Sequence, residues 1–303
     1  MMRIESLKDI SYYRDWKIIK RINKGWSEDE KFFIVDKLGN KLLLRLSDIS
    51  FYERKKSEFE NLKLVIEQEI NMSMPIDFGI CDNGNKVYLL FTWLEGEDAL
   101  DIWPTLNKHR QYELGVQAGK ILCKIHRIKP SETIGYWAEI YKNRIDTVIE
   151  AYKQCGHKIQ NEQEIIKFIY NNEKYLKGRP ITFQHGDYHI GNMVITPEGN
   201  LGIIDFNRSS FGDPWEEYDR FVFTWGESTY FANGQIHGYF NNNVPDDFFR
   251  LMALYSARNL IASIPWSLNF GEKELKTAMR NIDKVNNVYN GFETYIPRWY
   301  EEI

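Results

Sequence analysis

One polar stretch of the chain decides how the rest of it is interpreted. It reads Phe183-Gln184-His185-Gly186-Asp187-Tyr188-His189-Ile190-Gly191-Asn192, and it is followed by Ile203-Ile204-Asp205-Phe206. The residues Pro197-Glu198-Gly199-Asn200 between them have the composition of a tight turn, which predicts a hairpin. We therefore expect Asp187, Asn192 and Asp205 to lie on loops that are held by strands.

These residue types suit one kind of chemistry. The carboxylate of Asp187 can accept the proton of an attacking hydroxyl group. The side-chain oxygens of Asn192 and Asp205 are hard ligands of the kind that Mg²⁺ prefers, together with the phosphates of a substrate. One base and two metal ligands are what phosphoryl transfer from a nucleoside triphosphate requires.

Composition and charge limit the classes of protein to consider. The chain has 303 residues, with 39 Lys and Arg against 43 Asp and Glu, and this balance argues against a dedicated nucleic-acid binder. We find no apolar run long enough to span a membrane, and the charged start lacks the pattern of a signal peptide. The three cysteines are far apart and form no zinc-binding pair. We expect a cytoplasmic protein with no membrane or nucleic-acid partner, either a monomer or a weak homodimer.

The pattern of strands and helices divides the chain into two parts. The first hundred residues are predicted to be strands with one helix among them, and the later residues to be mostly helical. We expect an N-terminal nucleotide-binding lobe over 1–92, a hinge over 93–98 and a C-terminal catalytic and substrate-binding helical lobe over 99–303. Helices are predicted over 53–68, 112–127, 137–152, 162–176, 246–264 and 272–289.

The polar stretch also resembles a known family. His185-Gly186-Asp187 with Asn192 is similar to the catalytic loop of the protein-kinase-like superfamily, and Asp205-Phe206 is similar to its metal-binding element. With Gly212-Asp213-Pro214, the string resembles the aminoglycoside phosphotransferase and choline kinase group, and the likeness covers most of residues 16–265. It implies a two-lobed α+β fold, with a small antiparallel-sheet N-lobe carrying one helix and a larger, mostly helical C-lobe.

The resemblance also implies roles for residues of the catalytic segment. Asp187 would be the catalytic base, Asn192 and Asp205 would hold Mg²⁺, and His185 would support the catalytic loop. The activity implied is a small-molecule kinase that transfers the γ-phosphate of ATP or GTP to an alcohol group.

For the nucleotide, the resemblance implies residues of the N-lobe. Arg45 would be the cation that binds phosphate, and Glu58 would pair with it, with Glu60 as an open alternative. Thr92, Trp93 and Leu94 would form the hinge that contacts the purine. Ser27 would lie in the phosphate-covering loop, which has one glycine, so whether this loop closes over the nucleotide stays open.

The distribution of charge along the chain indicates which kind of acceptor to expect. From Phe211 onward, 13 acidic residues stand against 8 basic ones, which favours a cationic acceptor. We expect an aminoglycoside-type antibiotic or a related hydroxylated amine, and hence a role in antibiotic resistance, with Glu216, Glu217, Glu227 and Trp266 as candidate substrate-binding residues. A metabolite kinase of the choline, homoserine or sugar type is the alternative. Aromatic residues, which form 15% of the chain, crowd this same region and could supply ring faces to the acceptor.

Other interpretations stay open at this point. His185, Asp187 and His189 form an H-x-D-x-H segment that could hold zinc or iron in a metallohydrolase. A catalytically inactive kinase fold that only binds a nucleotide is a further alternative. Arg45 could be a surface cation at a strand edge, and Glu58 and Glu60 could belong to a solvated helix face.

Overall fold

The structure is a computed structural model that describes residues 7–23 and 29–302. It divides into two compact units, Met1–Glu97 with Met193–Arg208 and Asp98–Asn192 with Ser209–Ile303, which we call the N-terminal and C-terminal units. The segment Met193–Arg208 thus groups with the N-terminal unit by its contacts, although it lies far along the chain. The lobe boundaries expected at 1–92, 93–98 and 99–303 stay a prediction.

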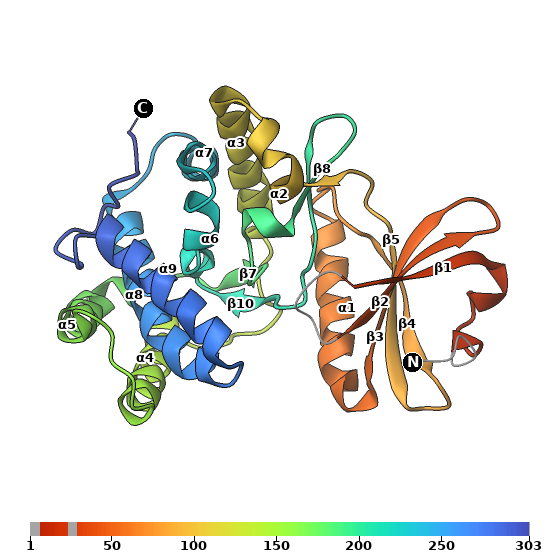
Figure 1. Cartoon of the computed structure of the whole chain (residues 1–303), viewed down its shortest axis with the longest axis horizontal. Coiled ribbons are helices and arrows are strands. Elements are labelled where there is room, and N and C mark those ends of the chain that lie inside the picture. Colours follow the sequence, from red (N-terminus) through yellow and green to blue (C-terminus); the bar gives the residue numbers. More distant parts are fainter. Residues whose placement is uncertain (1–6, 24–28, 303) are drawn as a thin grey trace. The chain divides into compact units, whose positions relative to one another are not determined.

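A five-stranded antiparallel sheet forms the N-terminal unit, with the strand order β1-β2-β3-β5-β4 (Figure 1). Its strands are β1 (Trp16–Ile22), β2 (Glu30–Asp36), β3 (Lys41–Asp48), β4 (Pro75–Cys81) and β5 (Lys86–Thr92). The strand β3 lies between β2 and β5, where Arg45 is opposite Lys31 on one side and Leu89 on the other. A central strand is buried on both sides, so Arg45 is placed in the interior of this unit.

One long helix, α1 (Tyr52–Ile66), packs on β4 and β5 of this sheet (Figure 1). Its apolar residues Phe59, Leu62 and Val65 are buried, and the ring of Phe59 stacks on that of Phe78 on β4. The strands β8 (Met193–Ile195) and β9 (Leu201–Ile203) form an antiparallel hairpin in a three-stranded sheet of order β6-β8-β9, in which β6 is Glu97–Asp98.

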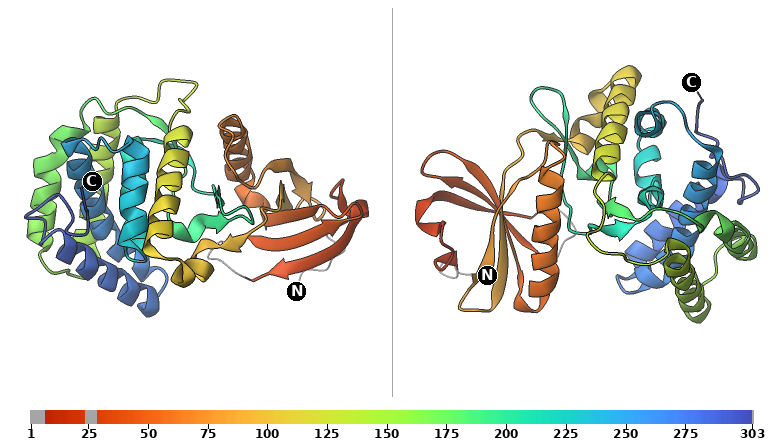
Figure 2. Two further views of the ribbon diagram at one scale, coloured as in Figure 1. Left: turned by 90° about the horizontal axis from the view of Figure 1, so that it is seen from above. Right: turned by 180° about the vertical axis from the view of Figure 1, so that it is seen from behind.

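Helices form most of the C-terminal unit (Figures 1 and 2). They are α2 (Ala99–Ile102), α3 (Lys108–Ile125), α4 (Trp137–Gln154), α5 (Glu162–Asn172), α6 (Val222–Trp225), α7 (Thr229–Phe240), α8 (Asp246–Leu268) and α9 (Glu272–Val288). The main apolar core of this unit joins α4, α5, α8 and α9. No helix within the described ranges has both the length and the apolar character that crossing a membrane would require.

The helices α3 and α7 approach each other unusually closely (Figure 2). Glycines stand at the contact on both helices, and a Cβ atom built on Gly119 would lie 2.1 Å from the carbonyl oxygen of Gln235. A Cβ atom on Gly238 would lie 2.3 Å from the carbonyl oxygen of Val116. Only glycine allows the two backbones to lie this close together.

Short strands position the polar stretch of the C-terminal unit. The strand β7 (Thr182–Gln184) is buried and pairs with β10 (Ser210–Gly212). The chain then turns at Gly186, whose φ of +81° lies in the region that favours glycine, and ends the loop in the 3₁₀ turn η6 (Ile190–Asn192). A second 3₁₀ turn, η7 (Pro214–Tyr218), follows β10. The remaining strand, β6 (Glu97–Asp98), lies where the chain passes from one unit to the other.

The helices expected from sequence lie close to those observed. The largest differences are at three helix ends: α3 begins at Lys108 and was expected from Tyr112, and α5 ends at Asn172 and was expected to reach Leu176. The helix α8 was expected to stop at Ile264 and continues to Leu268 through Pro265. Proline removes one main-chain hydrogen bond, but at this position only the last turn of the helix is affected.

Candidate active site

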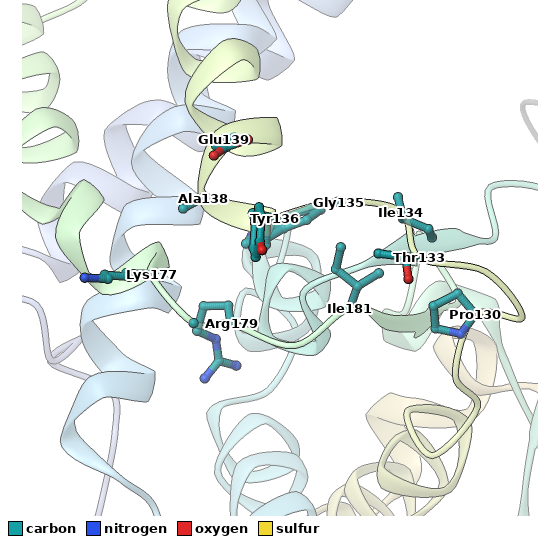
Figure 3. Close-up of a pocket in the computed structure, with 12 residues that line it drawn as sticks. Pro130, Thr133, Ile134, Gly135, Tyr136, Ala138, Glu139, Lys177, Arg179 and Ile181 are labelled. Carbon is teal, nitrogen blue, oxygen red and sulfur yellow. The ribbon is translucent and has the colours of Figure 1, made fainter.

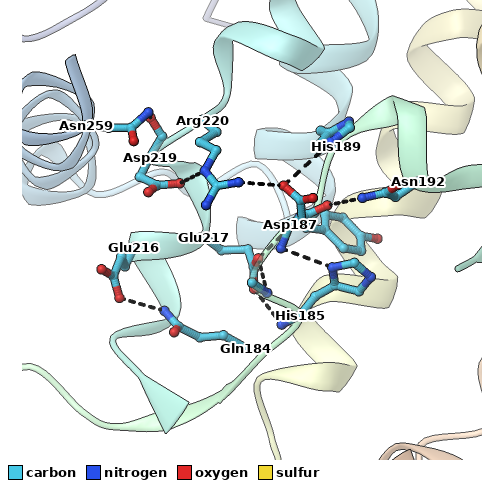
Figure 4. A network of polar contacts seen from close by, with 12 residues as sticks. Gln184, His185, Asp187, His189, Asn192, Glu216, Glu217, Asp219, Arg220 and Asn259 are labelled. Carbon is cyan, nitrogen blue, oxygen red and sulfur yellow. Dashed lines mark hydrogen bonds and ion pairs between the residues drawn. The ribbon is translucent and has the colours of Figure 1, made fainter. Parts of the chain in front are cut away.

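The side chain of Asp187 is held by a neighbouring arginine. Its Oδ1 accepts a hydrogen bond of 2.9 Å from Nη1 of Arg220, and Nε2 of His189 lies 3.6 Å from the same oxygen (Figure 4). The carboxylate therefore has a defined orientation, as a positioned base requires.

The main chain around Asp187 is held by one buried carboxylate. Glu217 accepts hydrogen bonds from the N–H groups of His185 and Gly186, both 2.8 Å long, and from that of Tyr188 at 3.3 Å (Figure 4). Burial acts to raise the pKa of Glu217, but the nearby His126, whose Nε2 lies 3.6 Å from Oε2 of Glu217, and the N–H of Gly186 outweigh it and lower this pKa below its ordinary value. Glu217 is thus a charged anchor of the loop. We replace its predicted role in acceptor binding with this one, because its carboxylate is buried and faces the main chain.

The two histidines of the H-x-D-x-H segment make hydrogen bonds to the main chain of the loop itself. Nδ1 of His185 accepts from the N–H of Asp187 at 3.2 Å, and Nδ1 of His189 accepts from the N–H of Gly191 at 3.0 Å. Over residues 7–23 and 29–302, no three His, Cys, Asp or Glu side chains are grouped so that they could hold a metal ion. The geometry therefore gives the metallohydrolase interpretation no support and shows His185 bracing the loop.

Asn192 and Asp205 present oxygen atoms with different surroundings. Nδ2 of Asn192 donates to the carbonyl oxygen of Asp187 at 2.9 Å, which orients the amide. Asp205, in the N-terminal unit, has a φ of +66°, and its Oδ1 lies 3.8 Å from Nη1 of Arg45. The amide oxygen of Asn192 and the carboxylate of Asp205 are each of a ligand type that Mg²⁺ takes, together with phosphate and water.

Arg45 lies at the centre of a buried ionic network in the N-terminal unit. Its Nη1 donates to Glu58 at 2.8 Å, and its Nε donates to Asp29 at 2.9 Å. Lys55 on α1 joins the network with hydrogen bonds of 2.7 Å to Asp29 and 3.2 Å to Glu58. Arg45, Lys55 and Glu58 are each no more than 5% exposed. Arg45 is therefore not the surface cation of the alternative interpretation.

This network separates the two glutamates considered as partners of Arg45. Glu58 is buried against the guanidinium, whereas Glu60 pairs with Lys63 on the outer face of α1. Burial acts to raise the pKa of Asp29, but the charges of Arg45 and Lys55 lower it well below its ordinary value. The network thus contains charged carboxylates and cations held in place by one another.

The expected hinge residues differ in their main-chain contacts. The N–H of Thr92 donates to the carbonyl oxygen of Met74, and that of Trp93 donates to the carbonyl oxygen of Lys41, both at 2.9 Å. The N–H of Leu94 makes no hydrogen bond within the described part of the chain, so of the three it is the one able to donate to a ligand. Ser27 lies outside the described residues.

The remaining acceptor candidates lie in different surroundings. Glu216 accepts from Nη1 of Arg144 at 3.2 Å and from Nε2 of Gln184 at 3.3 Å. Burial, with a further contribution from the charge of Asp219, raises the pKa of Glu216 to about 7. Glu227 is exposed, and Trp266 is 52% exposed with its ring 4.5 Å from that of Phe270.

Sequence reasoning missed Asp29, Lys55 and Arg220. A signal for Lys55 was present, because it lies three residues before Glu58 on a predicted helix and on the same face as Phe59 and Leu62. No comparable signal marks Asp29 or Arg220, since their partners lie 16 and 33 residues away along the chain.

A pocket of about 460 Å³ lies elsewhere in the C-terminal unit (Figure 3). It is lined by residues of the segments 130–139 and 177–181, none of which is a candidate site residue. Arg179, at its edge, is held by two hydrogen bonds to the buried Asp213. The pocket is thus separate in sequence from the Asp187 loop.

The chain is similar to proteins of a known family. The model of the "Phosphotransferase enzyme family" matches residues 18–254. The chain belongs to this phosphotransferase family. Its activity is therefore that of a small-molecule kinase with an alcohol group as acceptor, as expected from the sequence. A comparison with curated protein sequences finds no match.

Solved structures show the same fold at low sequence identity. The GDP complex of an aminoglycoside 2′-phosphotransferase-IIIa mutant has a TM-score of 0.69 and 13% identity, with 96% of each chain covered. A mutant of aminoglycoside phosphotransferase APH(4)-Ia, in a ternary complex with ADP and hygromycin B, has a TM-score of 0.67 and 14% identity, with 93% of this chain and 98% of that chain covered. A Haemophilus somnus 129PT protein described as a fructosamine-3-kinase has a TM-score of 0.64 and 15% identity, with 89% and 91% covered. The predicted α+β kinase-like fold is confirmed.

Proposed function

We propose that this phosphotransferase transfers the γ-phosphate of ATP or GTP to a hydroxyl group of an aminoglycoside-type compound or a related hydroxylated amine. The observation that carries the proposal is the Asp187 loop, in which a carboxylate is oriented by Arg220 and its main chain is anchored by Glu217. This arrangement suits a base that accepts the proton of the attacking hydroxyl.

The donor is a purine nucleoside triphosphate in this proposal. The solved relatives named above hold GDP in one case and ADP in another, which supports a nucleotide of either base. Arg45 would contact the phosphates and Glu58 would hold it in place, while the N–H of Leu94 would donate to the purine.

Asn192 and Asp205 are the residues that would hold Mg²⁺. When bound, the ion neutralises charge on the β- and γ-phosphates. The protein's own contribution is to hold the amide of Asn192 through the carbonyl of Asp187 and to orient the carboxylate of Asp205.

The chemistry at Asp187 follows from these assignments. The acceptor hydroxyl gives its proton to the Asp187 carboxylate while its oxygen forms a bond to the γ-phosphorus. The bond from that phosphorus to the bridging oxygen breaks, and the nucleoside diphosphate leaves with the electron pair. Positioning and electrostatics supply most of the rate enhancement in such transfers.

For the acceptor, the excess of acidic residues after Phe211 favours a cation. The exposed carboxylate of Glu227 and the exposed ring of Trp266 are our candidates for contacts with it, and one solved relative holds hygromycin B. A sugar-type metabolite kinase is the second candidate, supported by the likeness to the fructosamine-3-kinase structure.

A panel of acceptors tests the proposal. Aminoglycosides, choline, homoserine and sugars, each with ATP and with GTP, would be assayed by release of the nucleoside diphosphate. We expect turnover with an amine and a loss of about 10²–10⁴-fold in kcat in Asp187→Asn, with nucleotide binding retained. Turnover that survives Asp187→Asn would refute the mechanism, and turnover with neutral or acidic acceptors alone would refute the acceptor class.

A further inference from the structure

The guanidinium of Arg220 orients Asp187 in the proposed mechanism, but the mechanism gives it no contact with the substrates. Its Nη1 donates to Oδ1 of Asp187 at 2.9 Å, so a cation lies directly beside the reacting hydroxyl's proton acceptor (Figure 4). The side chain of Arg220 is 31% exposed, and that of Asp187 is 17% exposed. Both groups are therefore accessible to a bound substrate.

Arg220 differs in its exposure and in its hydrogen bonds from an arginine that has only a structural role. Arg179 of the same unit is 15% exposed and donates from both Nε and Nη2 to the buried Asp213. Two N–H groups on one edge of the Arg179 guanidinium therefore donate to a single carboxylate. In Arg220, only Nη1 donates to Asp187.

The Nε of Arg220 faces a second carboxylate, that of Asp219. This nitrogen lies 4.0 Å from Oδ1 of Asp219, and the carbonyl oxygen of Asp219 accepts from Nδ2 of Asn259 on α8 at 3.4 Å. The guanidinium is thus fixed between two carboxylates. Within the described ranges of the chain, its Nη2 has no hydrogen-bond partner.

We propose that Arg220 is a further catalytic residue, which donates through Nη2 to a non-bridging oxygen of the phosphoryl group as it passes to the hydroxyl held at Asp187. The inference rests on the proposed function, because it takes Asp187 as the base. The phosphorus bonds to the oxygen whose proton Asp187 accepts, so the phosphoryl oxygens come within a few ångströms of the guanidinium. Arg220 keeps its own protons throughout and supplies only charge and hydrogen bonds.

A planar guanidinium suits this part. It can hold a carboxylate with one N–H and a phosphoryl oxygen with another, whereas a lysine ammonium acts as a point charge. Fixed donors aimed at oxygens that gain charge in the transition state are among the largest contributions to catalysis. Asp219 is a positioning residue here, since it acts on the phosphoryl group only through Arg220.

The position of Arg220 also bears on the acceptor. A cation beside Asp187 repels an ammonium group, so the amines of a cationic acceptor must lie away from the hydroxyl that reacts. The acidic side chains that attract the acceptor would then act at a distance from the reacting atoms.

The test compares Arg220→Gln, Arg220→Lys and Arg220→Ala with Arg250→Gln, each made in the whole chain of 303 residues. Arg250 is a matched control, because it is 27% exposed and its Nε is 2.9 Å from Asp246, away from the site described. The acceptor is the best one found in the panel, and kcat and KM are measured for both substrates. Unfolding midpoints and nucleotide affinity are measured in parallel.

We expect Arg220→Gln to lower kcat by about 10²–10³-fold, with both KM values changed by less than about threefold. Arg220→Lys should recover part of that loss, because it restores the charge but not both hydrogen bonds. Methylguanidinium added at millimolar concentration to Arg220→Ala should restore part of kcat. No such rescue is expected if the role of Arg220 is only structural. The control Arg250→Gln should have the same kcat and KM values as the unaltered protein.

Several results would overturn the inference. One is a kcat of Arg220→Gln within about threefold of the unaltered protein. Another is a raised KM for the acceptor with kcat unchanged, which would make Arg220 an acceptor-binding residue. If Arg220→Gln does not fold, an unchanged kcat in Arg220→Lys together with no rescue by methylguanidinium would overturn it. Absence of turnover in the unaltered protein would reject the proposed function, whereas turnover lost in Asp187→Asn but kept in Arg220→Gln would reject this inference alone.

Discussion

Glu217 shows at the scale of one residue how the catalytic segment is held. A peptide loop that exposes several N–H groups in the interior of a protein needs an acceptor for them. The carboxylate of Glu217 supplies that acceptor to His185, Gly186 and Tyr188. The orientation of Asp187 thus depends on a buried residue that lies 30 positions later in the chain.

The first prediction concerns this anchor. Glu217→Gln replaces one acceptor oxygen by an NH₂ group that faces main-chain donors, so at least one N–H of the loop loses its partner. We expect a loss of stability on the order of 1–3 kcal/mol and a fall in kcat, measured by urea unfolding and by nucleoside diphosphate release. The exposed Glu164→Gln on α5 is the control, and equal behaviour of the two variants would contradict the assignment.

The second prediction concerns Glu216. Because burial and the charge of Asp219 raise its pKa to about 7, the folded protein binds a proton there that the unfolded chain has released. The stabilising contribution is fully present below the ordinary pKa of about 4.5 and is lost as the pH rises through about 7. Glu216→Gln removes this dependence while keeping a neutral group of the same shape.

The measurement is the free energy of unfolding of both proteins from pH 5 to pH 8.5. Relative to the unaltered protein, Glu216→Gln should gain on the order of 2–3 kcal/mol across this range. Glu164→Gln should show no such trend. A constant difference between Glu216→Gln and the unaltered protein would show that Glu216 titrates at its ordinary pKa.

At the scale of elements, the helices α3 and α7 of the C-terminal unit pack with their backbones close together. Glycines on both helices let main-chain atoms meet, and α3 also supplies the carbonyl oxygen of Ala118 that accepts from the hydroxyl of Tyr188 at 2.7 Å. The helix pair thus supports the loop that carries Asp187.

The third prediction tests this packing. In Gly119→Ala the new methyl group would lie 2.1 Å from the carbonyl oxygen of Gln235, so α3 and α7 must move apart. We expect destabilisation of about 1–3 kcal/mol, as for other overpacked interiors, with a lower midpoint of thermal unfolding. Lys120→Ala, on the exposed side of the same helix, should stay within about 0.5 kcal/mol. Equal stability of both variants would show that the helices can separate without cost.

The ionic network of the N-terminal unit is also a property of elements. Lys55 and Glu58 come from α1, Arg45 from β3, and Asp29 from the residue before β2. The content of Glu, Lys and Leu in α1 predicted the helix but not its buried face, because a face that includes a lysine looks solvated until its partners are known.

At the scale of the whole molecule, the distribution of charge bears on the acceptor class that we propose. The chain carries a formal charge of −4, and the residues after Phe211 hold 13 acidic against 8 basic residues. Such an imbalance would attract the cationic acceptor that we propose over distances comparable with the Debye length.

The fourth prediction follows from this screening. Between about 50 and 300 mM salt, we expect the KM of an amine acceptor to rise several-fold, because added ions screen the attraction. A neutral sugar acceptor of similar size should show little change. A KM for the amine that does not depend on salt would remove the charge argument for the acceptor class.

The sequence by itself determined the family, the α+β class and the segment that carries Asp187 and Asn192. It could do so because those residues lie within one short loop between strands, where spacing alone is informative. Only the tertiary structure decided that Asp29 and Lys55 join Arg45, and that Arg220 contacts Asp187. These partners lie 16 to 33 residues apart, and sheet register, helix packing and burial brought them together. A buried charge is stable only beside its partners, and those partners are chosen by the fold.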